Sequence, residues 1–201
     1  MTEITEITEP LRTVRTERLE LRAVGLDDLE PLFAINSDPE VWRHRPQGRH
    51  TEIGQTREWI ERAVEGWADG LSYWTVRLRG PGGAGGESDG GSGPVVGIGG
   101  VQTQVARAHW NLYYRLAPAH QGKGYATELS RAALAAARQH TPQLPVFAWI
   151  HPDNPGSRSV AGRLGLIDHG LRLDPIYHDL LHLYADRPQS EWPARAVFAN
   201  S

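Results

Sequence analysis

Two glycines within residues 121–126 constrain the fold of this chain more than any other feature. They follow a strand-like run at residues 110–116 and precede an alanine-rich stretch with helical spacing. Glycine permits positive φ angles, so the N–H groups of such a turn can converge on one point. A helix that begins there adds the positive end of its dipole. The segment therefore predicts a strand, an anion-binding turn and a helix, with a phosphate-bearing ligand.

Two common nucleotide-binding loops do not fit this turn. A P-loop would need glycine where Ala117 stands and serine or threonine where Gly124 stands. The dinucleotide fingerprint needs a third small residue where Thr127 stands, and a similar glycine run at residues 97–100 is followed by Gln102 at that position. An ordinary strand-to-helix turn without a ligand is the remaining alternative.

A second segment downstream narrows the ligand class. Strand-like residues 146–150 lead into Asn154 and Ser157, and a Leu-Gly pair follows. The pattern QxxGxA in the turn and NxxS…LG here, in this order, resembles the GNAT acyl-CoA N-acyltransferases over about residues 16–186. The first helix and the lead into the turn at residues 116–118 are similar to the branch that contains the ribosomal-protein N-terminal acetyltransferases, RimJ/RimL-like proteins.

Hydrophobic periodicity predicts the element order βααβββαβαββ. The expected strands are at residues 18–22, 73–78, 95–105, 110–116, 146–150, 166–173 and 177–184. The expected helices are at residues 27–36, from about residue 51, at 124–139 and up to residue 163. The resemblance implies the same class, a single-domain α/β (α+β) fold. It has a mixed central sheet of about seven strands with about four helices, and its central strands splay apart to hold acyl-CoA.

One domain, at residues 16–186, is expected to contain the whole core. Residues 1–15 repeat a short Thr-Glu-Ile unit and are predicted to be a flexible N-terminal tail, and residues 187–201 a C-terminal tail. Residues 80–93 hold 8 of the 22 glycines, so they cannot bury a core. A hairpin loop is favoured over a linker between domains, because the strands on either side need each other's hydrogen bonds.

Composition excludes several function classes. A net charge of −3 gives no basic surface for nucleic acid, and no positive block indicates a membrane surface. The absence of cysteine excludes disulfides, thiolate metal sites and an acyl-cysteine intermediate. No apolar run has membrane-spanning length and no signal-peptide pattern is present, so a cytoplasmic location is expected. His178 and His182 are four residues apart on an expected strand, so no metal site is expected.

The resemblance assigns a set of residues to acetyl-CoA: Leu116, Ala117, Gln121, Gly122, Lys123, Gly124, Tyr125, Ala126, Thr127, Asn154 and Ser157. The amides of the turn are expected to hold the pyrophosphate, with Leu116 and Ala117 presenting backbone groups to the pantetheine arm. Asn154 is expected to bond the arm from the other side. Asn154 and Ser157 also fit a helix cap, and the two roles can coexist.

The implied reaction is direct attack of an amine on the thioester in one ternary complex. Ser157 is the predicted catalytic donor to the departing thiolate, because Ala161 stands where many relatives have a tyrosine. The central strand offers Asn111 where many relatives carry a glutamate, so the base is not assigned and water can relay the proton. His109, His151 and Asp153 are expected near the cleft without an assigned role.

The predicted function is an acetyl-CoA-dependent N-acetyltransferase that acts on a primary amine, either a protein N-terminus or a small molecule. The cluster at residues 42–45 is expected beside the acceptor groove, with a solvated loop as the alternative. A non-catalytic acyl-CoA-binding or assembly module is the alternative function, motivated by the missing glutamate and tyrosine. Phosphoryl transfer ranks last, since no metal-binding carboxylates lie near the turn. A homodimer is one possible assembly.

Overall fold

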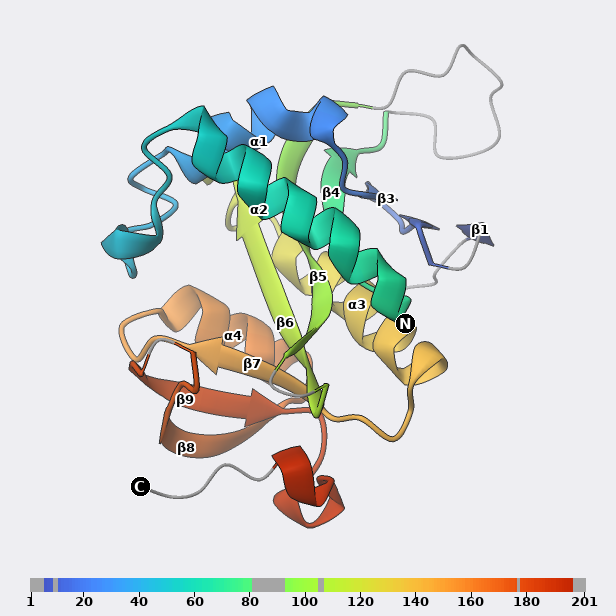
Figure 1. The fold of residues 1–201 in the computed structure, drawn as a ribbon, viewed down its shortest axis with the longest axis vertical. Coiled ribbons are helices and arrows are strands. Elements are labelled where there is room, and N and C mark those ends of the chain that lie inside the picture. Colours follow the sequence, from blue (N-terminus) through green and yellow to red (C-terminus); the bar gives the residue numbers. More distant parts are fainter. Residues whose placement is uncertain (1–5, 9–10, 81–92, 105–106, 177, 197–201) are drawn as a thin grey trace.

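A computed structural model describes residues 6–8, 11–80, 93–104, 107–176 and 178–196 (Figure 1). Within these residues, nine strands form one sheet in the order β1-β2-β3-β4-β5-β6-β7-β9-β8. The strands are β1 (Glu6–Thr8), β2 (Thr13–Arg15), β3 (Leu19–Ala23), β4 (Tyr73–Leu78), β5 (Val95–Gln104), β6 (His109–Leu116), β7 (Val146–Ile150), β8 (Ile167–Leu173) and β9 (Leu180–Ala185). All neighbours are antiparallel except β6 and β7, which are parallel. The sheet is therefore mixed, as predicted.

Four α-helices cover the two faces of this sheet (Figure 1). They are α1 (Leu29–Asn36), α2 (Ile53–Gly66), α3 (Tyr125–His140) and α4 (Pro155–Arg163). The helices α1 and α2 pack together over one face, while α3 and α4 lie against the other. Because side chains alternate along a strand, Leu112 of β6 packs in the core with α3 and its neighbour Tyr113 packs against the core of α1 and α2.

The helix α3 lies close to the sheet because both surfaces carry small residues. Its buried face includes Ala132, Ala133 and Ala136. On β5, a Cβ atom added at Gly99 would lie 2.7 Å from a methyl carbon of Leu129 on α3. This close packing fixes the start of α3, and with it the glycine turn, relative to β6.

The predicted N-terminal tail is wrong for residues 11–15. Strand β2 pairs with β3, and Val14 is only 1% exposed in the main core beside Leu11. The prediction of about seven strands falls short of the nine because β1 and β2 both lie within that supposed tail. Each is three residues long, too short to give a clear alternating pattern.

The predicted C-terminal tail is also wrong for part of its length. Trp192 and Ala196 are buried with Phe147 of β7 and Leu183 of β9, so the segment up to residue 196 covers the lower part of the sheet. Most of the predicted glycine-rich loop, residues 81–92, and residues 197–201 lie outside the described residues. The strands on either side of that loop pair directly with each other. Among the described residues, no helix is both long and apolar enough to span a membrane.

Candidate active site

The sheet opens where its two parallel strands diverge. In the described structure, β6 and β7 pair at only two positions, Trp110 with Val146 and Asn111 with Phe147. Beyond them, β6 continues along β5 to Leu116, whereas β7 continues along β9. The two strands therefore form the arms of a V (Figure 1). The predicted splay is confirmed, and it leaves backbone groups of both strands facing a gap instead of a partner strand.

The glycine turn connects the end of β6 to α3 with the predicted geometry. Gly122 has φ 72° and Gly124, the N-cap of α3, has φ 82°. A Cβ atom at Gly122 would meet nothing within 4 Å, so the backbone angle and not the space requires glycine there. The side-chain Nε2 of Gln121 donates to the carbonyl oxygen of Leu116 at 3.0 Å and closes the turn. A turn of this kind at the start of a helix can bind an anion.

Arg18, which sequence reasoning missed, holds this turn from the far end of the chain. Its Nη1 donates to the carbonyl oxygen of Lys123 at 2.9 Å, and its guanidinium lies 4.8 Å from the centre of the Tyr125 ring. Glu128 on α3 accepts from Arg18 Nε at 2.8 Å and from Thr16 Oγ1 at 2.6 Å. Arg18 and Glu128 are 110 residues apart, so no local pattern in the sequence indicates this contact.

The start of α4 faces the turn across the opening. Asn154 is the N-cap of α4, and its Oδ1 accepts from the backbone N–H of Ser157 at 3.0 Å, so the predicted cap is confirmed. The Ser157 side chain is hydrogen-bonded to the hydroxyl of Tyr114 on β6. Burial raises the pKa of Tyr114, an effect that the bond to Ser157 partly opposes. Tyr114 was not predicted, although its position between Leu112 and Leu116 places it on the α3 and α4 face of β6.

A cavity of about 400 Å³ lies between the glycine turn and the start of α4. It is lined by nine of the eleven predicted cofactor residues: Leu116, Gln121, Gly122, Gly124, Tyr125, Ala126, Thr127, Asn154 and Ser157. Lys123 and Ala117 are not part of its lining. The N–H of Ala117 donates to Val96, and its carbonyl accepts from His120, so the fold already uses both groups. We call this space the cofactor cavity.

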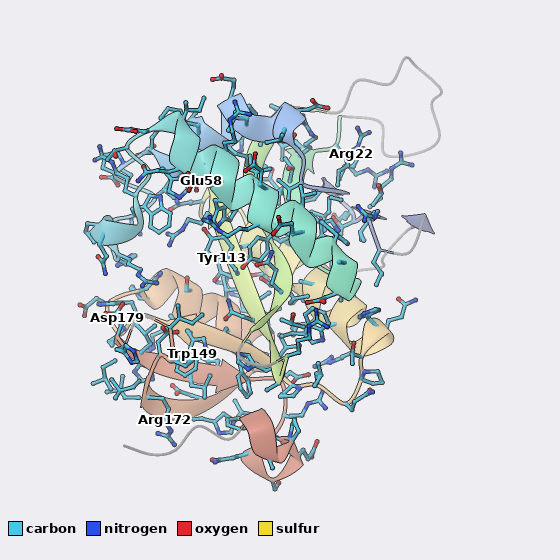
Figure 2. The ribbon with its side chains drawn as sticks, in the orientation of Figure 1. Arg22, Glu58, Tyr113, Trp149, Arg172 and Asp179 are labelled. Atoms are coloured by element: carbon cyan, nitrogen blue, oxygen red, sulfur yellow. The ribbon has the colours of Figure 1, made fainter. Side chains whose placement is uncertain are left out.

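A second cavity, of about 500 Å³, lies at the opening in the sheet and extends from α4 to α2 and the loop after α1. Aromatic rings form much of its wall: Trp42, Trp59, Tyr73, Tyr113 and Trp149. Figure 2 shows Tyr113 of β6 and Trp149 of β7 on either side of the opening in the sheet. Among the described residues, six line both cavities: His44, Tyr114, Arg115, Asn154, Ser157 and Val160. The second space, the acceptor cavity, therefore meets the cofactor cavity at Ser157.

The rings and charges of the acceptor cavity come from separate segments. The ring of Trp59 stacks on Tyr73 with centroids 5.6 Å apart, and Tyr73 lies 5.1 Å from Tyr113. An ion pair of 3.4 Å joins Arg45, in the loop after α1, to Asp179, in the connection from β8 to β9. This ion pair links two segments that border the cavity. Asp179 lies at the left side of the opening in Figure 2.

The cluster at residues 42–45 lies at the site, as predicted. Trp42 and Arg45 line the acceptor cavity, Arg43 lines the cofactor cavity, and His44 lines both. Trp42 is also a core anchor, 8% exposed, with the guanidinium of Arg115 3.4 Å from its ring centre. Trp42 is therefore both a core anchor and part of the wall of the acceptor cavity.

The predicted neighbours of the cleft divide into two groups. His109 is fully buried and stacks on Phe147 at 4.6 Å, and burial lowers its pKa to about 4. Neither His109 nor Asp153 belongs to the described lining of either cavity, whereas His151 and Asn111 line the acceptor cavity. Across the part of the chain that the structure describes, no group of three or more metal-ligating side chains is placed to hold an ion.

This combination of a splayed parallel strand pair, a glycine turn that opens a helix and two cavities joined through the sheet defines a class of acyltransferases. Residues 18–167 match the family model of the acetyltransferase (GNAT) domain. The chain belongs to this family of acetyltransferases, so the resemblance seen in the sequence is confirmed. A sequence search found no matching curated protein.

Solved structures share the fold at low sequence identity. A GNAT-family acetyltransferase from Bacillus anthracis is 22% identical with a TM-score of 0.67, covering 86% of this chain and 95% of its own. An acetyltransferase from Agrobacterium tumefaciens is 23% identical with a TM-score of 0.68, covering 90% and 98%. RimL, a ribosomal L7/L12 N-terminal acetyltransferase solved with coenzyme A, is 16% identical with a TM-score of 0.67, covering 91% and 97%. At these identities the likeness shows a shared fold.

Proposed function

We propose that this protein is an N-acetyltransferase that moves the acetyl group of acetyl-CoA to a primary amine by direct attack within a ternary complex. The observation that carries this proposal is the meeting of the two cavities at Ser157, through the gap between β6 and β7. A donor bound on the glycine turn and an acceptor bound in the second cavity would meet there. The solved relatives include one in complex with coenzyme A and another with acetyl-CoA.

The cofactor residues divide into three roles under this proposal. The amides that follow Gly122 and the dipole of α3 bind the pyrophosphate. The unpaired edges of β6 and β7 receive the amide-rich arm as an added strand. The Ser157 hydroxyl donates a proton to the departing thiolate, and its bond to Tyr114 holds that hydroxyl at the junction of the cavities.

For the acceptor, we propose a small primary amine in preference to a protein N-terminus. A cavity of about 500 Å³ with an aromatic wall suits a compact ligand. The ion pair between Arg45 and Asp179 links two segments that border the cavity, where an extended polypeptide would need room. Three arginines and two aspartates line the cavity, Arg45, Arg62, Arg115, Asp174 and Asp179, so a polyamine with several positive charges is disfavoured.

Calorimetry with acetyl-CoA, followed by a thiol-release assay, tests the proposal. We expect micromolar binding of acetyl-CoA and amine-dependent release of coenzyme A with an arylalkylamine, but weaker release with spermidine or a tetrapeptide. The Ser157→Ala variant should lose turnover by about 100-fold while it keeps its affinity for acetyl-CoA. The exposed Ser190→Ala serves as the matched control and should behave as the wild type.

Three outcomes would contradict parts of this proposal. A folded sample that does not bind acetyl-CoA would refute the acetyltransferase assignment. Binding without thiol release for any amine would favour the non-catalytic acyl-CoA-binding module. Faster release with the tetrapeptide than with the arylalkylamine would show that the acceptor is a protein N-terminus.

A further inference from the structure

One imidazole lies where the two cavities meet. Of the six residues that line both cavities, only His44 has a side chain that ordinarily accepts a proton near neutral pH. Arg115 stays charged, and the side chains of Tyr114 and Ser157 are weak acids. We infer that His44 is the general base that takes the proton from the acceptor amine. This inference rests on the proposed function and assigns the base that the central strand, with Asn111, does not supply.

The position of His44 suits this role. It belongs to the loop that follows α1 and is half-buried, with one side toward the cofactor cavity and the other toward the acceptor cavity. The Nε of Arg43 donates to Nε2 of His44 at 3.0 Å, so Nε2 carries the lone pair. That hydrogen bond is solvent-exposed, and an entering ammonium group can take the place of Arg43 as the donor.

The surroundings of His44 lower its pKa. Loss of hydration is the largest cause that lowers the pKa of His44, and Arg43, His151 and Arg115 lower it further. Asp153 alone among these neighbours raises it. A pKa below the ordinary 6.5 means that most of the imidazole is unprotonated at pH 7 and free to accept a proton. The same environment prevents the imidazolium from persisting after transfer, because its proton passes readily to water.

The proton balance of the reaction then closes with two groups of this chain. The amine arrives mostly as an ammonium ion, since its pKa is about 10, and Nε2 of His44 removes the first proton. The free amine attacks the thioester carbonyl, forming the carbon–nitrogen bond, and the carbon–sulfur bond breaks. Ser157 gives its proton to the thiolate sulfur, and the second proton from nitrogen replaces it. The products are the amide, coenzyme A as the thiol, and one proton released by His44.

Two other histidines of the acceptor cavity are less well placed. The Nδ1 of His151 accepts the backbone N–H of Asp153 at 3.2 Å, and His151 does not line the cofactor cavity. The Nδ1 of His50 is hydrogen-bonded to Thr56 Oγ1 at 2.8 Å, under the start of α2. Both therefore line the acceptor cavity alone, whereas His44 also lines the cofactor cavity.

A pH profile of turnover at saturating substrates distinguishes His44 from these neighbours. In the wild type, kcat should fall as the pH drops through a pKa below 6.5. In His44→Gln, kcat at pH 7 should fall by about 100-fold and that acidic limb should disappear. Added imidazole should restore part of the turnover in His44→Ala. Arg43→Gln should shift the acidic limb to higher pH, because it removes one of the charges that lower the pKa of His44.

Binding of acetyl-CoA, measured by calorimetry on each variant, separates failure of this inference from failure of the proposed function. If the wild type releases no coenzyme A with any amine, both the proposed function and the assignment of His44 as the base are refuted. If the wild type is active but His44→Gln keeps its turnover and its acidic limb, only the inference is overturned. It is also overturned if His151→Gln, and not His44→Gln, abolishes that limb.

Discussion

The cofactor cavity and the acceptor cavity are built in different ways. The cofactor cavity centres on one short turn, in which Gly122 and Gly124 have positive φ, and is completed by α3, α4, the end of β6 and the loop after α1. The acceptor cavity uses residues from the loop after α1, from α2 and α4, from four strands of the sheet and from the connection between β8 and β9. A site centred on a turn depends on the backbone angles of a few residues. A site lined by side chains from many segments depends on how those segments pack together. The two cavities should therefore respond to different kinds of substitution.

The largest effect should come from the residue that anchors the cofactor turn. Glu128→Gln replaces a buried carboxylate that accepts from Thr16 and Arg18, and we expect the free energy of unfolding to fall by about 3 kcal/mol. The partial exposure of Arg18 keeps the loss at the lower end of the range for broken buried ion pairs. Urea unfolding, followed by tryptophan fluorescence, measures it.

The matched control for this variant is Glu58→Gln on α2 (Figure 2). Glu58 pairs with Arg62 at 4.0 Å on an exposed helix face, so its loss should change stability by less than about 0.5 kcal/mol. Equal effects of the two variants would show that Glu128 does not anchor the turn.

The next largest effect should come from a change in the backbone conformation of the turn in the cofactor cavity. Gly124→Val places a β-branched residue at φ 82°, and we expect the affinity for acetyl-CoA to fall by about 30-fold. Calorimetry measures the loss, while the KM for the amine should stay nearly constant. Gly162→Ala, on the exposed face of α4 with no atom within 4 Å of the added Cβ, is the control and should bind acetyl-CoA normally. Normal binding by Gly124→Val would mean that the positive φ is not needed.

A smaller effect is expected from the aromatic wall of the acceptor cavity. Trp59→Leu removes the contacts of the indole ring with Tyr73 and Tyr113. We expect the KM for an arylalkylamine to rise by about tenfold. The affinity for acetyl-CoA should change by less than about twofold, because Trp59 lies outside the cofactor cavity. A loss of acetyl-CoA affinity as large as the rise in KM would show that the two cavities do not respond separately.

The smallest effect should come from the ion pair across the acceptor cavity. Both side chains are partly exposed, so Arg45→Gln should raise the KM of the arylalkylamine only about twofold. The KM of a tetrapeptide should fall at the same time, because the cavity is less constricted. Asp179→Asn should reproduce both changes, and the double variant should add nothing. Additive changes would show that the two residues act independently.

The same contrast explains how much could be predicted from the sequence. The positions of Gly122 and Gly124 within six residues, and Asn154 three residues before Ser157, were sufficient to locate the turn and the helix cap. The strand splay followed from the resemblance and was confirmed by the two-residue pairing of β6 with β7. These features are local, or depend on one strand order, so sequence patterns indicate them.

The remaining features depend on contacts between distant segments. Arg18 contacts Lys123 of the turn from 105 residues away, and Tyr114 contacts Ser157 across the gap between β6 and α4. The strand β2 and the segment that contains Trp192 are short pieces that are buried against the rest of the sheet. Their own sequences carry too little periodicity to predict them, so the sequence predicts tails at both termini.

The two-position pairing of β6 and β7 also has a mechanical consequence. In the described structure, the nine strands are almost divided into two sheets, one of β1 to β6 and one of β7, β9 and β8. The two sheets are joined by the pairs Trp110–Val146 and Asn111–Phe147. A ligand that hydrogen-bonds both arms of the gap would lock this joint as an added strand would. Under the proposed function that ligand is acetyl-CoA, which would then hold the two halves together as well as donate the acetyl group.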